Sequence, residues 1–123
     1  MTSLKTTLKR NHLTIGSWIT VSDPSIVELM AQAGFDWLTL DLEHSSIDIN
    51  QAQQLIRVID LCGVTPLVRV GANDPLIIKR VMDAGAHGVI VPMVNTAEDA
   101  RRAVNSVKYP PVGTRGVGLA RAQ

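Results

Sequence analysis

Two spacings of apolar residues alternate along the chain, one typical of strands and the other of amphipathic helices. Short runs of apolar or alternating residues predict strands at 13–19, 36–42, 65–70 and 88–93. Apolar residues spaced i, i+3, i+4, i+7 predict a helix after each strand, beginning near residues 24, 49, 75 and 97. The pattern therefore predicts four consecutive strand–helix units joined by short loops.

Capping residues set the starts of these helices. Asp23-Pro24 and Asp74-Pro75 each supply an N-capping carboxylate followed by proline at the first helical position. Asp48 or a neighbouring serine begins the second helix, and Thr96 with Asp99 approximates a capping box for the last. The residues expected on the buried faces of the first and last helices are Ile26, Val27, Met30, Ala100, Ala103 and Val104.

A weak internal repeat supports a regular α/β fold. Ala33-Gly34-Phe35-Asp36 and Ala84-Gly85-Ala86-His87 precede the second and fourth strands, with an offset of 51 residues (84 − 33 = 51), or two units. Strict alternation of strands and helices requires parallel strands, so the candidates are a doubly wound sheet and a (β/α)8 barrel. A barrel needs about 250 residues and eight units. The 123-residue chain is therefore expected to form half a barrel or a small complete sheet.

Composition indicates a soluble globular protein, with 46% hydrophobic and 19% charged residues. The net charge of +1 and an aromatic content of 3% argue against a nucleic-acid partner. No apolar run is long enough to span a membrane, so no membrane partner is expected. The single cysteine, Cys62, cannot form an internal disulfide and is expected to pack as a small apolar residue in a reducing cytoplasm.

The candidate catalytic residues lie where the second and third strands end. The run Asp36 to Leu42 is followed at once by Glu43 and His44, and Arg69 stands at the end of the third strand. Because the carboxyl ends of parallel strands meet, a base, a carboxylate and a cation would face a common space. That set suits proton abstraction beside a developing oxyanion. The alternative is a surface ion pair, and spacing alone does not decide between them.

Longer motifs resemble the HpcH/HpaI aldolase family, whose best-known members are the 4-hydroxy-2-oxoheptanedioate and 2-keto-3-deoxy-L-rhamnonate aldolases. The resemblance runs in order from about Ile15 to the last residue. It implies an α/β TIM (β/α)8 barrel of which residues 1–123 form a single partial domain, the first half. The motifs that carry it are Trp37-Leu38-Thr39-Leu40-Asp41-Leu42-Glu43-His44, Leu67-Val68-Arg69, Asn73-Asp74-Pro75, Met82-Asp83-Ala84-Gly85-Ala86, Val91-Pro92-Met93-Val94 and Tyr109-Pro110-Pro111-Val112-Gly113-Thr114-Arg115-Gly116-Val117-Gly118.

The resemblance implies a metal-dependent, class II pyruvate aldolase, a carbon–carbon lyase that cleaves a 4-hydroxy-2-oxo acid to pyruvate and an aldehyde. A divalent metal, Mg2+ or Mn2+ and in some members Co2+, would chelate the keto acid. His44 would act as the base, Arg69 would stabilise the enolate, and Asp83 would raise the basicity of the histidine. Asp83 ends a helix, whose C-terminus should lie near the other face of the barrel, so Asp41 competes for that last role.

This sequence departs from the family pattern at its C-terminal end. In the family a Glu and an Asp after strands five and six hold the metal, whereas this sequence stops at Gln123, so no metal ligand is assigned here. A truncated product, a fragment or one piece of a split enzyme is therefore expected. Two alternative functions stay open, a catalytically inactive assembly module and a CoA-ester lyase like the citrate lyase β family. The open edges of a half barrel, and the family, both predict a homo-oligomer.

Overall fold

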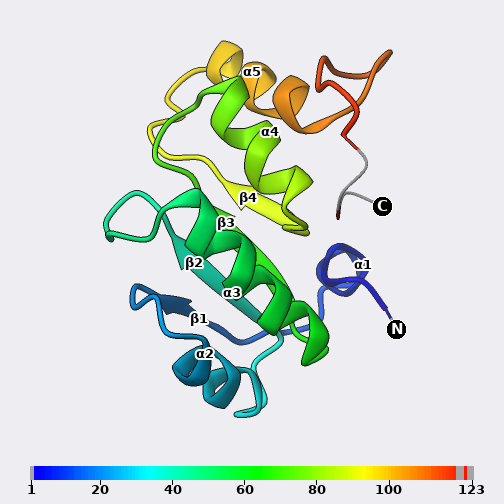
Figure 1. The fold of residues 1–123 in the computed structure, drawn as a ribbon. Coiled ribbons are helices and arrows are strands. Elements are labelled where there is room, and N and C mark those ends of the chain that lie inside the picture. The colour runs from blue at the N-terminus through cyan, green and yellow to red at the C-terminus, as the bar shows by residue number, and fades with distance from the viewer. Residues whose placement is uncertain (1, 119–120, 122–123) are drawn as a thin grey trace.

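The structure is a computed structural model that describes residues 2–118 and residue 121. Four parallel strands form one sheet in the order β1-β2-β3-β4 (Figure 1). The remaining positions of the expected domain 1–123, Gln123 among them, lie outside the described residues. The elements in chain order are α1 (Leu4–Lys9), β1 (Gly16–Ile19), α2 (Pro24–Ala31), β2 (Trp37–Asp41), α3 (Ile49–Leu61), β3 (Thr65–Arg69), α4 (Pro75–Asp83), β4 (Gly88–Ile90) and α5 (Ala97–Val107).

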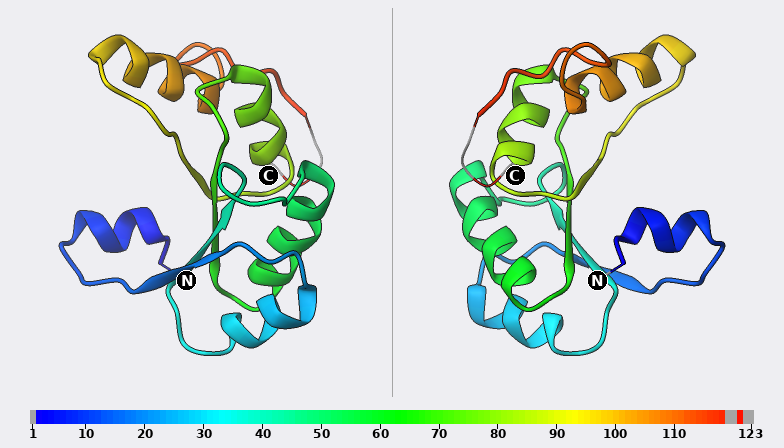
Figure 2. Two further views of the ribbon diagram at one scale, coloured as in Figure 1. Left: turned by 90° about the vertical axis from the view of Figure 1, so that its left-hand side faces the viewer. Right: turned by 90° about the vertical axis from the view of Figure 1, so that its right-hand side faces the viewer.

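The sheet carries its helical layer on one face. Helices α2, α3 and α4 lie together on that face, whereas α1 lies on the opposite side of the sheet (Figure 2). Every strand after β1 is reached through a helix, as parallel pairing requires. The four expected strand–helix units and the α/β class are therefore confirmed. No helix in the described part of the chain is both long enough and apolar enough to cross a membrane.

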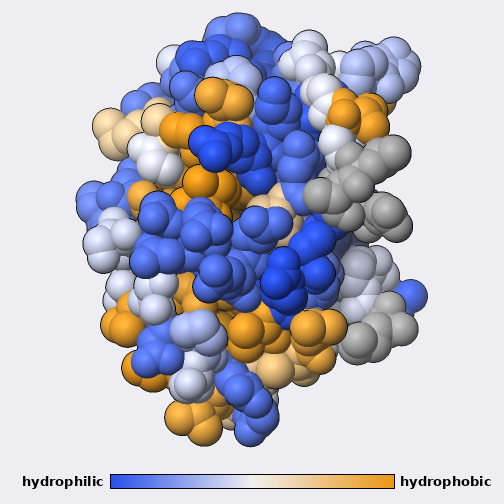
Figure 3. Space-filling model, viewed as in Figure 1, coloured by the Kyte–Doolittle hydropathy of each residue, from blue (hydrophilic) through white to orange (hydrophobic). Residues whose placement is uncertain are grey.

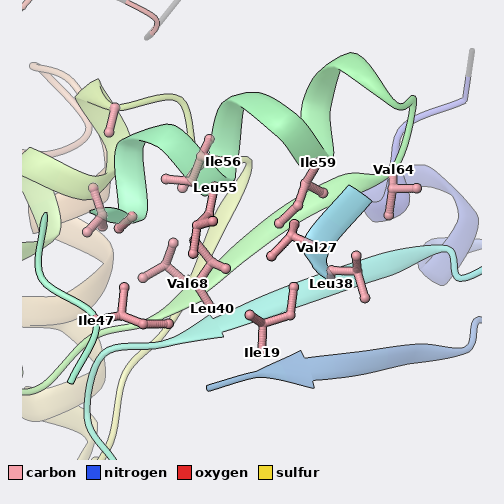
Figure 4. Packing of buried hydrophobic residues seen from close by; sticks show 14 of the residues in the cluster. Ile19, Val27, Leu38, Leu40, Ile47, Leu55, Ile56, Ile59, Val64 and Val68 are labelled. Atoms are coloured by element: carbon pink, nitrogen blue, oxygen red, sulfur yellow. The ribbon is translucent and has the colours of Figure 1, made fainter. Parts of the chain in front are cut away.

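The core lies between the sheet and α3. Leu38 and Leu40 of β2 point toward this helix and are fully buried, as is Val68 of β3 (Figure 4). They meet the apolar face of α3, which supplies buried Leu55, Ile56 and Ile59 at helical spacing. Because strand residues alternate between faces, Thr39, Asp41 and Arg69 lie on the other face of the sheet. The alternation that places apolar side chains in the core thus also places the polar candidate site residues together on one surface.

Side-chain caps form at the helix starts that the sequence predicts. The Asp48 carboxylate accepts the Gln51 backbone N–H at 2.8 Å, and the Gln51 side chain accepts the Asp48 N–H at 3.0 Å. Asp23 and Asp74 cap the two helices that begin with proline. Thr96 accepts the Asp99 N–H at 3.0 Å, so all four expected helix starts are confirmed.

Two strand boundaries and one helix differ from the sequence prediction. Strand β1 begins at Gly16 rather than residue 13, because the segment before it has no regular partner on β2, which starts at Trp37. Strand β4 ends at Ile90 rather than residue 93, where Met93 adopts a positive φ of 57°. The short helix α1 was not predicted, since it buries none of its residues and so has no apolar periodicity to detect.

Several side chains expected to be buried are exposed. Cys62 caps the end of α3 and is exposed rather than packed as a small apolar residue. Ile26 on α2 is 43% exposed, and Val104 on α5 is 52% exposed. Ala100 is exposed as well, and the buried residue of α5 is Ser106. Helix α2 lies beside edge strand β1, and apolar surface is visible around it at the bottom of Figure 3.

Candidate functional site

Asp41 and Arg69 form the centre of the candidate site at the carboxyl ends of β2 and β3. The two residues are partners in the parallel register. The guanidinium donates from Nη2 to Asp41 Oδ2 at 2.6 Å and from Nε to Oδ1 at 3.1 Å, a two-pronged contact. Only 3% of Asp41 is exposed. The hydrogen bond from Arg69, aided by two backbone N–H groups and opposed by burial, lowers the pKa of the Asp41 carboxyl to about 2.

Asp41 also orders the loop that follows β2. Its Oδ1 accepts the backbone N–H groups of Glu43 at 3.0 Å and His44 at 3.1 Å. The Ser45 hydroxyl donates to the Asp41 carbonyl oxygen. A buried carboxylate that accepts successive backbone donors fixes the turn by which the strand ends. Asp41 therefore positions both neighbouring side chains, and also the Arg69 side chain on the next strand.

Glu43 connects the imidazole of His44 to the guanidinium of Arg69. Glu43 Oε1 lies 3.0 Å from His44 Nε2 and 3.7 Å from Arg69 Nε. The His44 side chain is 71% exposed, whereas the Glu43 side chain is 20% exposed. The hydrogen bond with Asp41 is the main cause that raises the pKa of Arg69 above its ordinary value. The negative charges of Asp41 and Glu43 raise it as well. The structure thus brings His44 and Arg69 to one solvent-facing surface, as the sequence predicts.

The aromatic ring of Trp18 completes this surface from β1. The guanidinium carbon of Arg69 lies 4.6 Å from the centroid of the Trp18 ring, in cation–π geometry. Sequence reasoning missed this contact because it depends on the pairing register of three strands. The available signal was alternation along β1, which places Trp18 on the same face of the sheet as Arg69. The Trp18 ring and the Asp41 carboxylate together hold the guanidinium in one orientation.

Asp83 lies apart from these residues within the chain. It is the last residue of α4, and its Oδ1 lies 3.4 Å from Arg115 Nη1. Because a crossover helix runs back along the sheet, its C-terminus lies near the start of β4, at the opposite end from Arg69. The carboxylate beside the imidazole of His44 is Glu43, and Asp41 touches only the backbone of His44. The catalytic role of Asp83 therefore stays a prediction.

The described residues do not fit a metal centre. No group of three or more His, Cys, Asp or Glu side chains placed to hold a metal occurs among residues 2–118 and 121. Both carboxylate oxygens of Asp41 already accept from Arg69, and one also accepts two backbone N–H groups. Glu43 and His44 remain as a pair of donors, which is fewer than divalent metals usually take from a protein.

A family model described as HpcH/HpaI aldolase/citrate lyase matches residues 14–122, most of the chain. The chain belongs to this family. The 2-dehydro-3,6-dideoxy-6-sulfogluconate aldolase of Pseudomonas putida is 46% identical over 109 residues, covering 89% of this chain and 43% of that enzyme. The 4-hydroxy-2-oxo-heptane-1,7-dioate aldolase of Escherichia coli is 41% identical over 121 residues, covering 98% of this chain and 46% of that enzyme.

Solved structures of the family show the same arrangement of strands and helices. The HpcH/HpaI aldolase from Desulfitobacterium hafniense superposes with a TM-score of 0.87 at 37% identity. The superposition covers 94% of this chain and 45% of that one. This chain therefore has four parallel βα units that match part of the TIM barrel of HpcH/HpaI aldolases. It spans less than half the length of the relatives it matches.

Proposed function

We propose that this HpcH/HpaI chain contributes the proton-transfer half of an aldolase site, and that residues 1–123 act as one partial barrel domain. The reaction would cleave a 4-hydroxy-2-oxo acid reversibly to pyruvate and an aldehyde. One observation carries the proposal: His44 Nε2 and Arg69 Nε both lie close to Glu43 Oε1, at 3.0 Å and 3.7 Å, where two parallel strands end. The relatives named as aldolases support it.

His44 is the base in this proposal. Its exposed imidazole removes the proton from the C4 hydroxyl of the substrate, and the C3–C4 bond breaks as the C4 carbonyl of the aldehyde forms. The bonding electrons pass to the enolate of pyruvate, whose C3 then takes a proton. Glu43 Oε1, 3.0 Å from Nε2, is placed to accept a hydrogen bond from the imidazolium that exists between these two proton transfers.

Arg69 stabilises the negative oxygen in this scheme. The enolate oxygen at C2 develops its charge as the carbon–carbon bond breaks, and a fixed cation lowers the energy of that state more than the energy of the ground state. Asp41 and the ring of Trp18 hold the guanidinium in place, so little reorganisation is needed during the reaction. Asp41 thus acts as a positioning residue. It does not touch the substrate.

The metal implied by the family resemblance would chelate the keto acid and withdraw charge from it. Because the described residues do not fit a metal centre, we propose that its ligands lie outside residues 2–118 and 121. The steps assigned to His44 and Arg69 remain the same whichever segment or partner supplies those ligands. A divalent cation belongs in every assay of this chain for that reason.

Release of pyruvate tests the proposal. The chain, together with the segment or partner that supplies the metal ligands, is incubated with Mg2+ or Mn2+ and 4-hydroxy-2-oxo-heptane-1,7-dioate, and pyruvate is measured over time. We expect His44→Ala to abolish release. The matched control is His12→Ala, an exposed histidine before β1, and it should retain the activity. Equal activity in the two variants would overturn the assignment of the base.

One observation favours a second function, that of an assembly module without activity of its own. The described residues lack a set of three metal-binding side chains, so the folded chain would contribute structure and half a site only. In that case the folded chain releases no pyruvate with either metal. Activity of the chain alone that is lost in His44→Ala excludes this second function.

A further inference from the structure

The loop between β2 and α3 carries His44, and side-chain hydrogen bonds give this loop its shape. Residues 42–48 follow β2 and precede α3. Near the start of the loop, Asp41 Oδ1 accepts the backbone N–H groups of Glu43 and His44. At its end, Asp48 caps α3. The contacts made directly after His44, between these two points, therefore decide how freely the imidazole can move.

Ser45 makes those contacts. Its hydroxyl donates a hydrogen bond to the Asp41 carbonyl oxygen and accepts the Ile47 N–H at 3.1 Å. A hydroxyl can do both at once, because it has one donor and two acceptor sites. One bond ties the chain back to the end of β2, and the other ties it forward to the segment that enters α3. Together they enclose the part of the loop that carries His44.

The partners of the Ser45 hydroxyl are themselves fixed. The Ile47 side chain is 4% exposed and belongs to the hydrophobic core, so packing holds the backbone of this residue in place. Asp41 is the last residue of β2 and pairs with Arg69 of β3. The hydroxyl thus connects the loop to the core on one side and to the sheet on the other.

Capping of α3 does not account for Ser45. The sequence allows either Asp48 or a neighbouring serine as the N-cap, and the structure gives this role to Asp48, whose carboxylate accepts the Gln51 N–H at 2.8 Å. Both hydrogen bonds of the Ser45 hydroxyl run to the backbone of the loop itself. Serine side chains that bond to neighbouring backbone groups in this way stabilise turns.

We propose that Ser45 is a positioning residue for His44, a role that rests on the proposed function, in which His44 is the base. The His44 side chain is 71% exposed, so little packing holds the ring beside Glu43 Oε1, which lies 3.0 Å from Nε2. The backbone must therefore orient it. The Asp41 carboxylate fixes the N–H of His44, and the Ser45 hydroxyl fixes the chain that follows. Ser45 does not touch the substrate.

Loss of the hydroxyl should slow the reaction without weakening binding. A base that leaves its reacting position costs rate, whereas the groups that bind substrate stay where they are. We expect Ser45→Ala to lower kcat about tenfold and to leave KM within about twofold of its original value. Ser45→Thr keeps the hydroxyl and should restore kcat. The matched control is Ser46→Ala, an exposed neighbouring serine, which should behave as the unmodified protein.

Amide hydrogen exchange followed by NMR tests the positioning without any substrate. The sample is the chain together with the segment or partner that supplies the metal ligands. Ser45→Ala removes the acceptor of the Ile47 N–H but leaves Asp41 Oδ1, the acceptor of the His44 N–H. Faster exchange at His44 therefore reports motion of the loop and not a missing acceptor. We expect it to be at least about fivefold faster in Ser45→Ala, and unchanged in Ser45→Thr and Ser46→Ala.

Three results would overturn the proposal. The first is unchanged exchange at the His44 amide in Ser45→Ala, and the second is a normal kcat in that variant although the amide exchanges faster. The third is an equal loss of kcat in Ser46→Ala. Unmodified protein that releases no pyruvate would instead refute the proposed aldolase function, and exchange at His44 would still show whether Ser45 orders the loop. Amides within α3 should exchange alike in all variants, which confirms that each has folded.

Discussion

At the scale of residues, Asp41 determines the geometry of the candidate site. It is 3% exposed, receives two hydrogen bonds from Arg69, and accepts the backbone N–H groups of Glu43 and His44. A buried charge with this many donors is stable where it lies, but removal of the charge leaves those donors without a partner. The stability of the chain and the orientation of His44, the proposed base, therefore depend on the same carboxylate.

Asp41→Asn is expected to lower the free energy of unfolding by about 2 kcal/mol, because the Arg69 ion pair is lost and Asn accepts fewer hydrogen bonds. Urea unfolding followed by circular dichroism measures the difference. Glu98→Gln is the matched control, since its pair with Arg101 is exposed at 72% and 70% and should contribute less than about 0.5 kcal/mol. Equal effects of the two substitutions would contradict the role given to Asp41.

Acid should weaken the fold through the same group. The pKa of Asp41 is about 2 in the folded chain, below the ordinary value of 3.8, so its contribution is fully present above pH 3.8 and is lost as the pH falls through 2. The shift corresponds to about 2 kcal/mol. Urea unfolding at a series of pH values checks this. The extra loss between these pH values should be missing from Asp41→Asn, and its persistence there would assign it to other carboxyl groups.

The sequence alone could locate His44, Glu43 and Arg69, because the ends of adjacent parallel strands must meet. It could not show that Asp41 pairs with Arg69, since this depends on which residues face each other across two strands. Trp18 was missed for the same reason. Local patterns identify the residues that reach an edge of the sheet, whereas the contacts among them depend on register.

At the scale of elements, helix starts are the most predictable feature of this chain. An N-cap is decided by a few consecutive residues, and Asp23, Asp48, Asp74 and Thr96 all act as the sequence predicts. Helix faces are less predictable, because burial depends on the neighbour that covers the face. Val104 illustrates this, since its position on α5 is apolar but 52% exposed.

Removal of the cap of α3 should weaken the fold measurably. Asp48→Ala removes the acceptor of the Gln51 N–H, and we expect a loss of about 1 kcal/mol in the free energy of unfolding. Asp48→Ser retains an oxygen at the N-cap and serves as the control. Urea unfolding of both variants measures the difference. A loss of the same size in Asp48→Ser would show that the charge of the side chain matters and not its hydrogen bond.

At the scale of the whole molecule, the four described strands match part of the barrel of solved relatives. The repeat of 51 residues relates both the strand pairs and the hydrogen bonds that precede them. The sequence shows this repeat only weakly, because few residues are identical in the two copies. The two halves share a backbone geometry although most of their side chains differ. The repeat is therefore clearer in the structure than in the sequence.

In the proposed function, His44 and Arg69 of this chain form and stabilise a pyruvate enolate. Exchange of the methyl protons of pyruvate for deuterium, followed by NMR in D2O with Mg2+ or Mn2+ present, measures that step without the aldehyde. We predict exchange that is lost in His44→Gln and is reduced in Arg69→Lys, where the ammonium keeps the charge but not the two-pronged geometry. Exchange that persists unchanged in His44→Gln would contradict the claim.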